Sequence, residues 1–283
     1  MYNPEEILII GKTGQLAQSL RELMPGAHSV GRPEFNVADA STHAHIPWSK
    51  YKIIINASAY TAVDAAETPD GRKEAWGVNA IGVRNLCAYA LQYNAALIHV
   101  STDYVFDGLT PNHSETEAVA PLNVYGHSKA AGELAVSLLP KHYIIRTQWL
   151  IGAGKNFVRT MYDLGKKGVS PSVVNDQFGR LTFTNSLADF VAYLLEHGHA
   201  YGTYHFSNTG AVASWADIAA EVFKIANFES HVIPVTTEEF KKDRSPFAER
   251  PSHCDFNLTK MISTGFTTRD WQTKLKIYLD SLN

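Results

Sequence analysis

The first 20 residues contain the feature that most limits how this chain can fold. An uninterrupted apolar run at residues 7–10 is followed by Gly11, Gly14 and Ala17, three residues apart, and then by an amphipathic stretch. Small residues at these places permit a tight turn, let backbone amides approach a phosphate, and allow a helix to pack against the preceding strand. The pattern therefore predicts a strand, a phosphate-binding turn and a helix whose amino end faces the phosphates. An ordinary glycine-rich turn is the alternative.

Three further apolar runs of strand length follow, and helical patterns separate them. The runs cover residues 53–55, 96–100 and 143–145, and the helical patterns cover residues 71–92 and 123–139. Continuous apolar runs are typical of strands buried on both faces, and strands that alternate with helices are typical of right-handed βαβ units. The chain is therefore expected to form an α/β fold with a doubly wound parallel sheet of the Rossmann type.

The amino-acid pattern of the chain changes after residue 150, where glycines and polar loops become frequent. One further helix is predicted at residues 156–166. Another is predicted to run to about residue 226 from Ser214, which suits an N-cap because Asp217 lies three residues later. We expect residues 1–150 to form a dinucleotide-binding domain and residues 151–283 to form mainly a smaller substrate-binding subdomain. The boundary between the two is expected to be discontinuous.

Composition excludes several classes of protein. The net charge is −3 and the 25 lysines and arginines are scattered, so neither nucleic acid nor a membrane is an expected partner. Two distant cysteines, Cys87 and Cys254, exclude a disulfide scaffold and a CxxC motif. The apolar run near the N-terminus is too short for a signal peptide or a membrane span, so a cytoplasmic protein is expected.

The pair Tyr125 and Lys129 gives the first indication of chemistry. Their spacing of four residues, inside a helical pattern, places both side chains on one face of a helix. A free tyrosine has a pKa of about 10, and a nearby ammonium group stabilises the phenolate and lowers that pKa towards working pH. The phenol can then donate a proton to a carbonyl oxygen while hydride reaches the carbon. Lys129 can also hold the ribose of a nicotinamide cofactor.

Thr102 is the third candidate for the catalytic group. It lies in the segment 101–106, directly after the apolar run at residues 96–100. Ligands of such folds bind beyond the carboxyl ends of the strands, so Thr102 is placed to hydrogen-bond a substrate carbonyl. A hydroxyl that only caps a turn is the alternative. Together with Tyr125 and Lys129, Thr102 predicts a nicotinamide-dependent carbonyl reductase.

The choice of cofactor depends on residues 29–34, where the second strand of such a fold is expected to end. An acid there selects NAD, whereas an arginine accommodates the extra phosphate of NADP. Arg32 favours NADP, and Glu34, two residues later, weakens that inference. NADPH is therefore the expected cofactor, with NADH as the alternative. A solvated surface charge is the alternative role for Arg32.

These residues resemble the extended short-chain dehydrogenase/reductases, and more narrowly the dTDP-4-dehydrorhamnose reductase family. The similarity extends over nearly the whole chain, and as a set its motifs are highly specific. They are residues 11–16 (GKTGQL), 56–64 (NASAYTAVD), 101–108 (STDYVFDG), 121–126 (PLNVYG), 146–149 (RTQW), 156–157 (NF), 174–179 (VNDQFG), 204–208 (YHFSN) and 250–251 (RP).

The resemblance implies NADPH-dependent reduction of the 4-keto group of a dTDP-4-keto-6-deoxyhexose. The expected reaction converts dTDP-4-dehydrorhamnose into dTDP-L-rhamnose, or is a close analogue of it. The product would serve polysaccharide synthesis, such as that of a spore coat or another surface polymer. The dTDP-sugar is the expected partner and a homodimer the expected assembly, whereas the identity of the sugar and the product stereochemistry are left open.

The resemblance also implies roles for individual residues. Thr102, Tyr125 and Lys129 form the catalytic group. The cofactor would be contacted by Tyr125 and Lys129 and also by Gly11, Lys12, Thr13, Gly14, Gln15, Leu16, Asn36, Val37, Ala59, Tyr60 and Thr61, in addition to Arg32, which was inferred above from its position. The substrate would be contacted by Thr102, Asp103, Trp149, Asn156, Gln177 and Arg250. Core packing is the alternative for Trp149, and a structural ion pair is the alternative for Arg250.

The chain departs from the family pattern at three places. Ala17 stands where a third glycine is usual, residues 180–182 (RLT) occupy a stretch where a proline is typical, and Glu249 stands where a second arginine is often found. The second and third changes could alter which sugar or nucleotide is accepted. The glutamates that link dimers through magnesium in the family are not identifiable here, so no metal is expected.

Two rival functions are weighed against a reductase. A dehydratase on this scaffold would have Asp-Glu after the threonine, whereas this chain has Asp103 and Tyr104, so the base for elimination is missing. An epimerase shares Thr102, Tyr125 and Lys129 but recycles its cofactor, so net oxidation of NADPH would distinguish the two. A non-catalytic nucleotide-binding regulatory subunit would not need the proton donor, and the presence of all three residues favours an enzyme.

Overall fold

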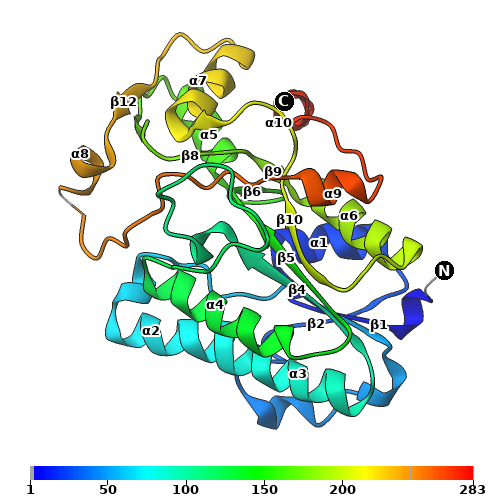
Figure 1. Cartoon of the computed structure of the whole chain (residues 1–283). Helices are drawn as coiled ribbons and strands as arrows, with labels where there is room; N and C mark the ends of the chain where they lie inside the picture. The colour runs from blue at the N-terminus through cyan, green and yellow to red at the C-terminus, as the bar shows by residue number, and fades with distance from the viewer. Residues whose placement is uncertain (1–2, 243, 283) are drawn as a thin grey trace.

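The computed structural model describes residues 3–242 and 244–282. Its centre is a six-stranded sheet in the order β10-β5-β4-β3-β1-β2, in which every neighbouring pair is parallel (Figure 1). The strands are β1 (Ile7–Ile10), β2 (His28–Val30), β3 (Ile53–Asn56), β4 (Ala96–Thr102), β5 (His142–Thr147) and β10 (Gly202–Phe206). The expected doubly wound parallel sheet is confirmed.

The central strands form because their side chains are buried on both faces of the sheet. Every residue of β1 and β4 is buried. Ile7 and Ile9 belong to one apolar core, whereas Leu8 and Ile10 belong to another, as the alternation of side chains along a strand requires. A strand covered on both sides has no polar face, so its sequence is an unbroken apolar run.

Helices cover both faces of the sheet (Figure 1). On one face α1 (Gln15–Leu23) packs against α6 (Thr184–His197). On the other face α3 (Val83–Gln92) packs against α4 (Val124–Ser137). The helix expected at residues 71–92 is continuous but irregular, because α2 (Pro69–Trp76) joins α3 through a π-helical segment, η5 (Gly77–Gly82).

The remaining elements are short, and several belong to a third apolar core. The strands are β6 (Leu150–Ile151), β7 (Ser172–Val174), β8 (Phe178–Gly179), β9 (Thr182–Phe183), β11 (Ala213–Ser214) and β12 (Ile233–Val235). The helices are α5 (Phe157–Lys166), α7 (Trp215–Ile225), α8 (Thr237–Lys241), α9 (Thr259–Ser263) and α10 (Trp271–Asp280). The 3₁₀ turns are η1 (Pro4–Glu6), η2 (Ala40–His43), η3 (Trp48–Lys50), η4 (Ala65–Glu67) and η6 (Asp103–Val105).

The second half of the chain contributes to both parts of the molecule. Ser214 and Asp217 form the expected capping box of α7, which packs against α5 and α10. Yet α6 and β10 also lie after residue 150, and β10 is the edge strand beside β5. The expected division of the chain at residue 150 stays a prediction. None of the helices in the described ranges combines the length and apolarity that crossing a membrane would need.

Candidate active site

A cleft of about 710 Å³ lies beyond the carboxyl ends of the sheet strands. Its wall joins the loop after β1, the end of β4, the first turns of α4 and the segment after β5. Most of the residues predicted for the cofactor line it, and these are Gly11, Lys12, Thr13, Gly14, Gln15, Leu16, Arg32, Asn36, Val37, Ala59, Thr61, Tyr125 and Lys129. Thr102, Asp103 and Trp149 line it as well. The fold thus brings together residues from separate parts of the chain.

The loop after β1 has the geometry that a phosphate needs. Gly11 has φ +117°, and an added Cβ would lie 3.1 Å from the Ala57 backbone, so only glycine suits this place. Gly14 is the N-cap of α1 and forms no side-chain capping bond, which leaves the amide groups at this helix end open to a ligand. Ala17 is fully buried in the packing of α1 on the sheet, so its methyl group is accommodated.

The end of the cleft that is predicted to hold the adenosine is bordered by two cations. Lys12 and Arg32 both line it, and Arg32 follows the end of β2. Glu34, which weakened the NADP inference, lies 3.9 Å from Lys12 Nζ and does not line the cleft. Two cations beside the predicted ribose position suit an additional phosphate better than an acid would.

Tyr60 is the one predicted cofactor residue outside the cleft lining. Its backbone N–H donates to Asn79 Oδ1 at 2.9 Å, and its carbonyl accepts from Asn79 Nδ2 at 3.1 Å. Asn79 belongs to η5 and also bonds Ser128 of α4. These bonds position the β3 loop, including Ala59 and Thr61, along the cleft wall.

Tyr125 and Lys129 lie one turn apart near the start of α4, and both are buried. Asn123 is the N-cap of this helix and accepts a hydrogen bond from Gly126 N at 2.8 Å. Burial raises the pKa of Tyr125 above its ordinary value, and the charge of Asp103 adds to this while Thr102 opposes it. The phenol is therefore protonated at neutral pH.

The effect of Lys129 differs from the sequence-based expectation that it lowers the pKa of Tyr125. Its Nζ donates to the Val100 carbonyl at 2.6 Å and lies 3.5 Å from His99 Nε2. Burial lowers the pKa of Lys129 to about 8, and the charge of Glu133 opposes that shift. The pKa of the neighbouring phenol of Tyr125 is raised rather than lowered, because burial is the largest influence on it.

Several residues that line this end of the cleft also carry buried polar atoms without partners in the described part of the chain. Thr102 Oγ1 donates to Asp103 Oδ1 at 2.8 Å, and the Cys254 thiol also interacts with this carboxyl group. Asp103 Oδ2 is buried and has no nitrogen or oxygen partner among the described residues. The same holds for Ser101 Oγ, Thr147 Oγ1 and Gln148 Nε2, which also lie in the cleft lining. Burial raises the pKa of Asp103 to about 6. Unpaired buried polar groups are costly, so their clustering fits a polar ligand such as ribose or a sugar.

Trp149 combines an unusual backbone with a large apolar surface in the cleft. Its φ is +46°, which is rare for a bulky residue and is found most often at functional sites. Its ring stacks on Trp215 with 3.7 Å between centroids, and Trp215 also lines the cleft. Trp215 was not predicted from the sequence, because its position after the N-cap Ser214 signals only the start of a helix.

Three residues predicted to contact the substrate lie outside the cleft lining. Asn156 caps α5 through Arg159 N and donates to the Tyr278 hydroxyl at 2.8 Å. Gln177 Nε2 donates to Thr237 Oγ1 at 2.9 Å. These groups already have protein partners, so their contacts with a substrate stay predictions.

Arg250 is the third of these residues, and it lies beside a departure from the family pattern. It forms an ion pair with Asp64 at 2.7 Å and lies over the Phe247 ring. The carbonyl of Glu249 accepts from Asn123 Nδ2 at 2.7 Å, which links this segment to the cap of α4. Arg180, the other departure, donates to the carbonyls of Gly210 and Phe256 and lies outside the cleft lining.

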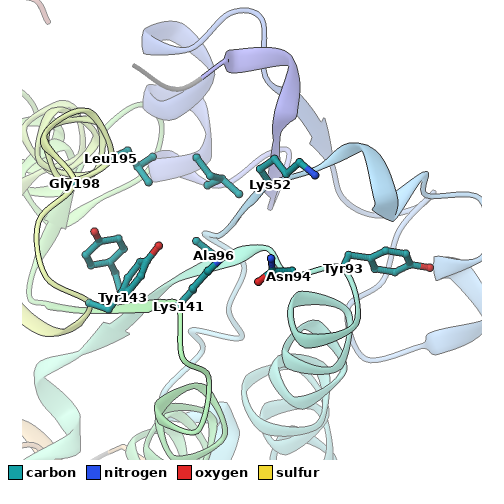
Figure 2. A pocket seen from close by; sticks show the side chains of 10 residues that line it. Lys52, Tyr93, Asn94, Ala96, Lys141, Tyr143, Leu195 and Gly198 are labelled. Carbon is teal, nitrogen blue, oxygen red and sulfur yellow. The ribbon is translucent and has the colours of Figure 1, made fainter.

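A second hollow, of about 400 Å³, lies at the opposite edge of the sheet (Figure 2). Lys52 and Leu195 face Tyr143 and Lys141 across it, near the amino ends of β3, β4 and β5. Ligands of open parallel sheets bind at the carboxyl ends, and none of the residues predicted for catalysis lies in this hollow. In the described ranges, no group of three His, Cys, Asp or Glu side chains is placed to hold a metal ion.

The parallel sheet, the phosphate loop and the Thr102, Tyr125 and Lys129 group define an NAD(P)H-dependent oxidoreductase of the extended short-chain dehydrogenase/reductase type. Residues 5–283 match the model of the RmlD substrate binding domain, and the chain belongs to this family.

Comparison with known proteins agrees with this assignment. The chain is 38% identical to a dTDP-4-dehydrorhamnose reductase of Aggregatibacter actinomycetemcomitans, over 95% of this chain and 97% of the relative. It is 33% identical to the spore coat polysaccharide biosynthesis protein SpsK of Bacillus subtilis, over 97% and 96%. Among solved structures, a dTDP-4-dehydrorhamnose reductase from Bacillus anthracis in complex with NADP has a TM-score of 0.86 and 36% identity, covering 97% of this chain and 98% of that one.

Proposed function

We propose that this protein uses NADPH to reduce the 4-keto group of a dTDP-4-keto-6-deoxyhexose, as in the conversion of dTDP-4-dehydrorhamnose into dTDP-L-rhamnose. The observation that carries the proposal is the convergence of Thr102, Tyr125 and Lys129 in the cleft that also contains the phosphate loop. Relatives named as reductases of dTDP-linked 4-keto sugars support the substrate class. Spore-coat or other surface polysaccharide synthesis is a fitting pathway, given the similarity to SpsK.

The cofactor would occupy the cleft from Arg32 to Lys129. Amide groups of the loop from Gly11 to Gly14 would hold the pyrophosphate, and Lys12 and Arg32 would hold the additional phosphate. When bound there, NADPH supplies the hydride that reduces the sugar carbonyl. Lys129 would bond the nicotinamide ribose.

Tyr125 would donate the proton that completes the reduction. Burial keeps its phenol protonated, which is the form that a donor to a carbonyl oxygen requires. In the structure Thr102 Oγ1 donates to Asp103, so its hydrogen would have to turn to the carbonyl oxygen when the sugar binds. Asp103 Oδ2 would then accept a bond from a sugar hydroxyl, and Trp149 would pack on the sugar ring.

The test is a coupled assay that supplies dTDP-4-keto-6-deoxy sugars and follows both NADPH oxidation and the product stereochemistry by NMR. Stoichiometric loss of NADPH is expected. A changed sugar without net NADPH oxidation would instead identify an epimerase, and ligand binding without turnover would identify a regulatory subunit. We also propose that the protein works in the cytoplasm and forms a homodimer. Cell fractionation tests its location, and light scattering tests its oligomeric state.

Tyr125→Phe provides the sharpest variant for this assay. It removes the proton donor but keeps the ring, so turnover should fall by roughly 10²–10⁴-fold while NADPH binding is retained. Tyr93→Phe, at the hollow on the opposite sheet edge, is the matched control and should keep full turnover. Wild-type turnover in Tyr125→Phe would remove Tyr125 from the mechanism.

A further inference from the structure

A buried series of polar contacts runs from β3 through β4 to Lys129 on α4. Asn56 ends β3 and His99 lies within β4, and the side chains of Asn56, His99 and Lys129 are at most 1% exposed. Asn56 Nδ2 lies 3.0 Å from His99 Nδ1, and His99 Nε2 lies 3.5 Å from Lys129 Nζ. The proposed mechanism uses neither Asn56 nor His99.

Ser58 determines which way the Asn56 amide points. Asn56 Oδ1 accepts from the backbone N–H of Ser58 at 3.1 Å and from its hydroxyl at 2.7 Å. A backbone N–H can only donate, so Oδ1 must face Ser58 and the NH₂ group must face His99. His99 Nδ1 is therefore an acceptor, and the proton of the neutral imidazole lies on Nε2.

The Nε2–H of His99 consequently faces Lys129 Nζ. An ammonium group has three donors and no acceptor, so a charged Lys129 would point an N–H group at the N–H group of His99 and form no hydrogen bond with it. A neutral amine offers its lone pair to His99 while it still donates to the Val100 carbonyl at 2.6 Å. The imidazolium form of His99 is disfavoured as well, because burial lowers the pKa of His99 well below its ordinary value.

We propose that His99, oriented by Asn56, is a positioning residue for Lys129: it donates a hydrogen bond to the neutral amine and thereby lowers the pH at which Lys129 releases its proton. The proposal rests on the proposed function only for the catalytic importance of Lys129. Burial lowers the pKa of Lys129 to about 8, and the hydrogen bond from His99 would act in the same direction.

The other titratable groups near α4 do not account for this preference. Glu133, one turn after Lys129, raises the pKa of Lys129, and its carboxylate is bound by Arg146 of β5 at 2.8 Å. The remaining titratable groups on the packed elements are distributed as follows: Tyr125 and His127 on α4, Asp103 and Tyr104 on η6, Glu67 on η4, His142 and Tyr143 on β5, and Cys87 and Tyr89 with the exposed charges of α2 and α3. Across the described part of the chain, the hydrogen bonds of Nζ go to Val100 and His99.

The first test needs no variant. Nitrogen-15 NMR of the histidine side chains, on the protein without ligands, reports which imidazole nitrogen carries the proton. We expect His99 to be neutral at pH 7 with the proton on Nε2. A proton on Nδ1, or a charged imidazole, would overturn the proposal.

The second test reverses the tautomer. In Asn56→Asp a carboxylate would accept a hydrogen bond from Nδ1–H of His99. Nε2 of His99 would then accept a hydrogen bond from the ammonium group of Lys129, so the titration midpoint of Lys129 should rise by about one pH unit. His99→Gln, whose amide oxygen can also accept from the ammonium, should raise the midpoint without adding a charge. His197→Gln, at the exposed end of α6, is the matched control and should leave it unchanged.

The midpoint is measured by carbon-13 NMR of lysine labelled at its ε carbon, with Lys129→Met to assign the resonance. Folded Asn56→Asp and His99→Gln proteins with the wild-type midpoint would overturn the proposal. Neither measurement contains sugar or NADPH, so failure here leaves the reductase function to be decided by the coupled assay alone.

Discussion

Alanine substitutions at three glycines separate the structural role of the phosphate loop from its binding role. Gly11 has φ +117°, and a Cβ there would lie 3.1 Å from the backbone of Ala57 and Ser58. Gly14 has an ordinary φ of −70°. A Cβ added at Gly14 would lie 4.0 Å from the Ala57 carbonyl oxygen, which is an ordinary contact. Gly168 has φ +71° with nothing within 4 Å, and it does not line the cleft.

The geometry sets the size of each effect on the free energy of unfolding. Gly168→Ala places a side chain in the left-handed region in open space and should cost about 1–2 kcal/mol. Gly11→Ala adds a close contact with rigid backbone, so we expect a total of about 3 kcal/mol. Gly14→Ala changes only an N-cap and should cost about 1 kcal/mol or less. Its methyl group would nevertheless occupy the space that the pyrophosphate needs, so NADPH affinity should fall by about tenfold or more, equivalent to about 1.4 kcal/mol.

Urea denaturation measures the stabilities, and fluorescence titration with NADPH measures the affinities. Gly168→Ala controls for left-handed strain and should bind NADPH as the wild type does. Equal destabilisation by Gly11→Ala and Gly168→Ala would refute the contact argument. Unchanged NADPH affinity in Gly14→Ala would show that this loop does not hold the pyrophosphate.

Two further substitutions test the charges of the cleft. Burial raises the pKa of Asp103 from 3.8 to about 6, so the native state holds a proton that the unfolded state releases, and stability falls as pH rises between these values. Asp103→Asn should therefore increase the free energy of unfolding at pH 7 by up to about 3 kcal/mol, but it should not do so at pH 3. Turnover of this variant should decrease. An equal gain in stability at both pH values, measured by urea denaturation, would contradict this reasoning. Arg32→Ala should weaken NADPH binding by about tenfold and leave NADH binding unchanged, because only NADPH carries the additional phosphate. An unaltered preference in binding titrations would exclude Arg32 from that role.

Much of the fold was predictable because its signals are local. The strand at residues 7–10 and the helix from Asn156 are specified by contiguous patterns of apolar and capping residues. The irregular join between α2 and α3 was not predicted, because a π-helical segment keeps the same apolar pattern as a regular helix. The edge strand β10 was also missed, since its place beside β5 depends on residues far from it in the chain.

The candidate site likewise has some features that the sequence predicted and others that only the structure revealed. The sequence alone predicted a phosphate-binding loop and the residue types of a catalytic group, since short spacings encode both a tight turn and one face of a helix. Only the tertiary structure decided that Trp215 borders the cleft and that Asn156 donates a hydrogen bond to Tyr278. It also decided that Lys129 faces His99, because burial and hydrogen-bond partners, which set a pKa, come from separate strands and helices that meet only after folding.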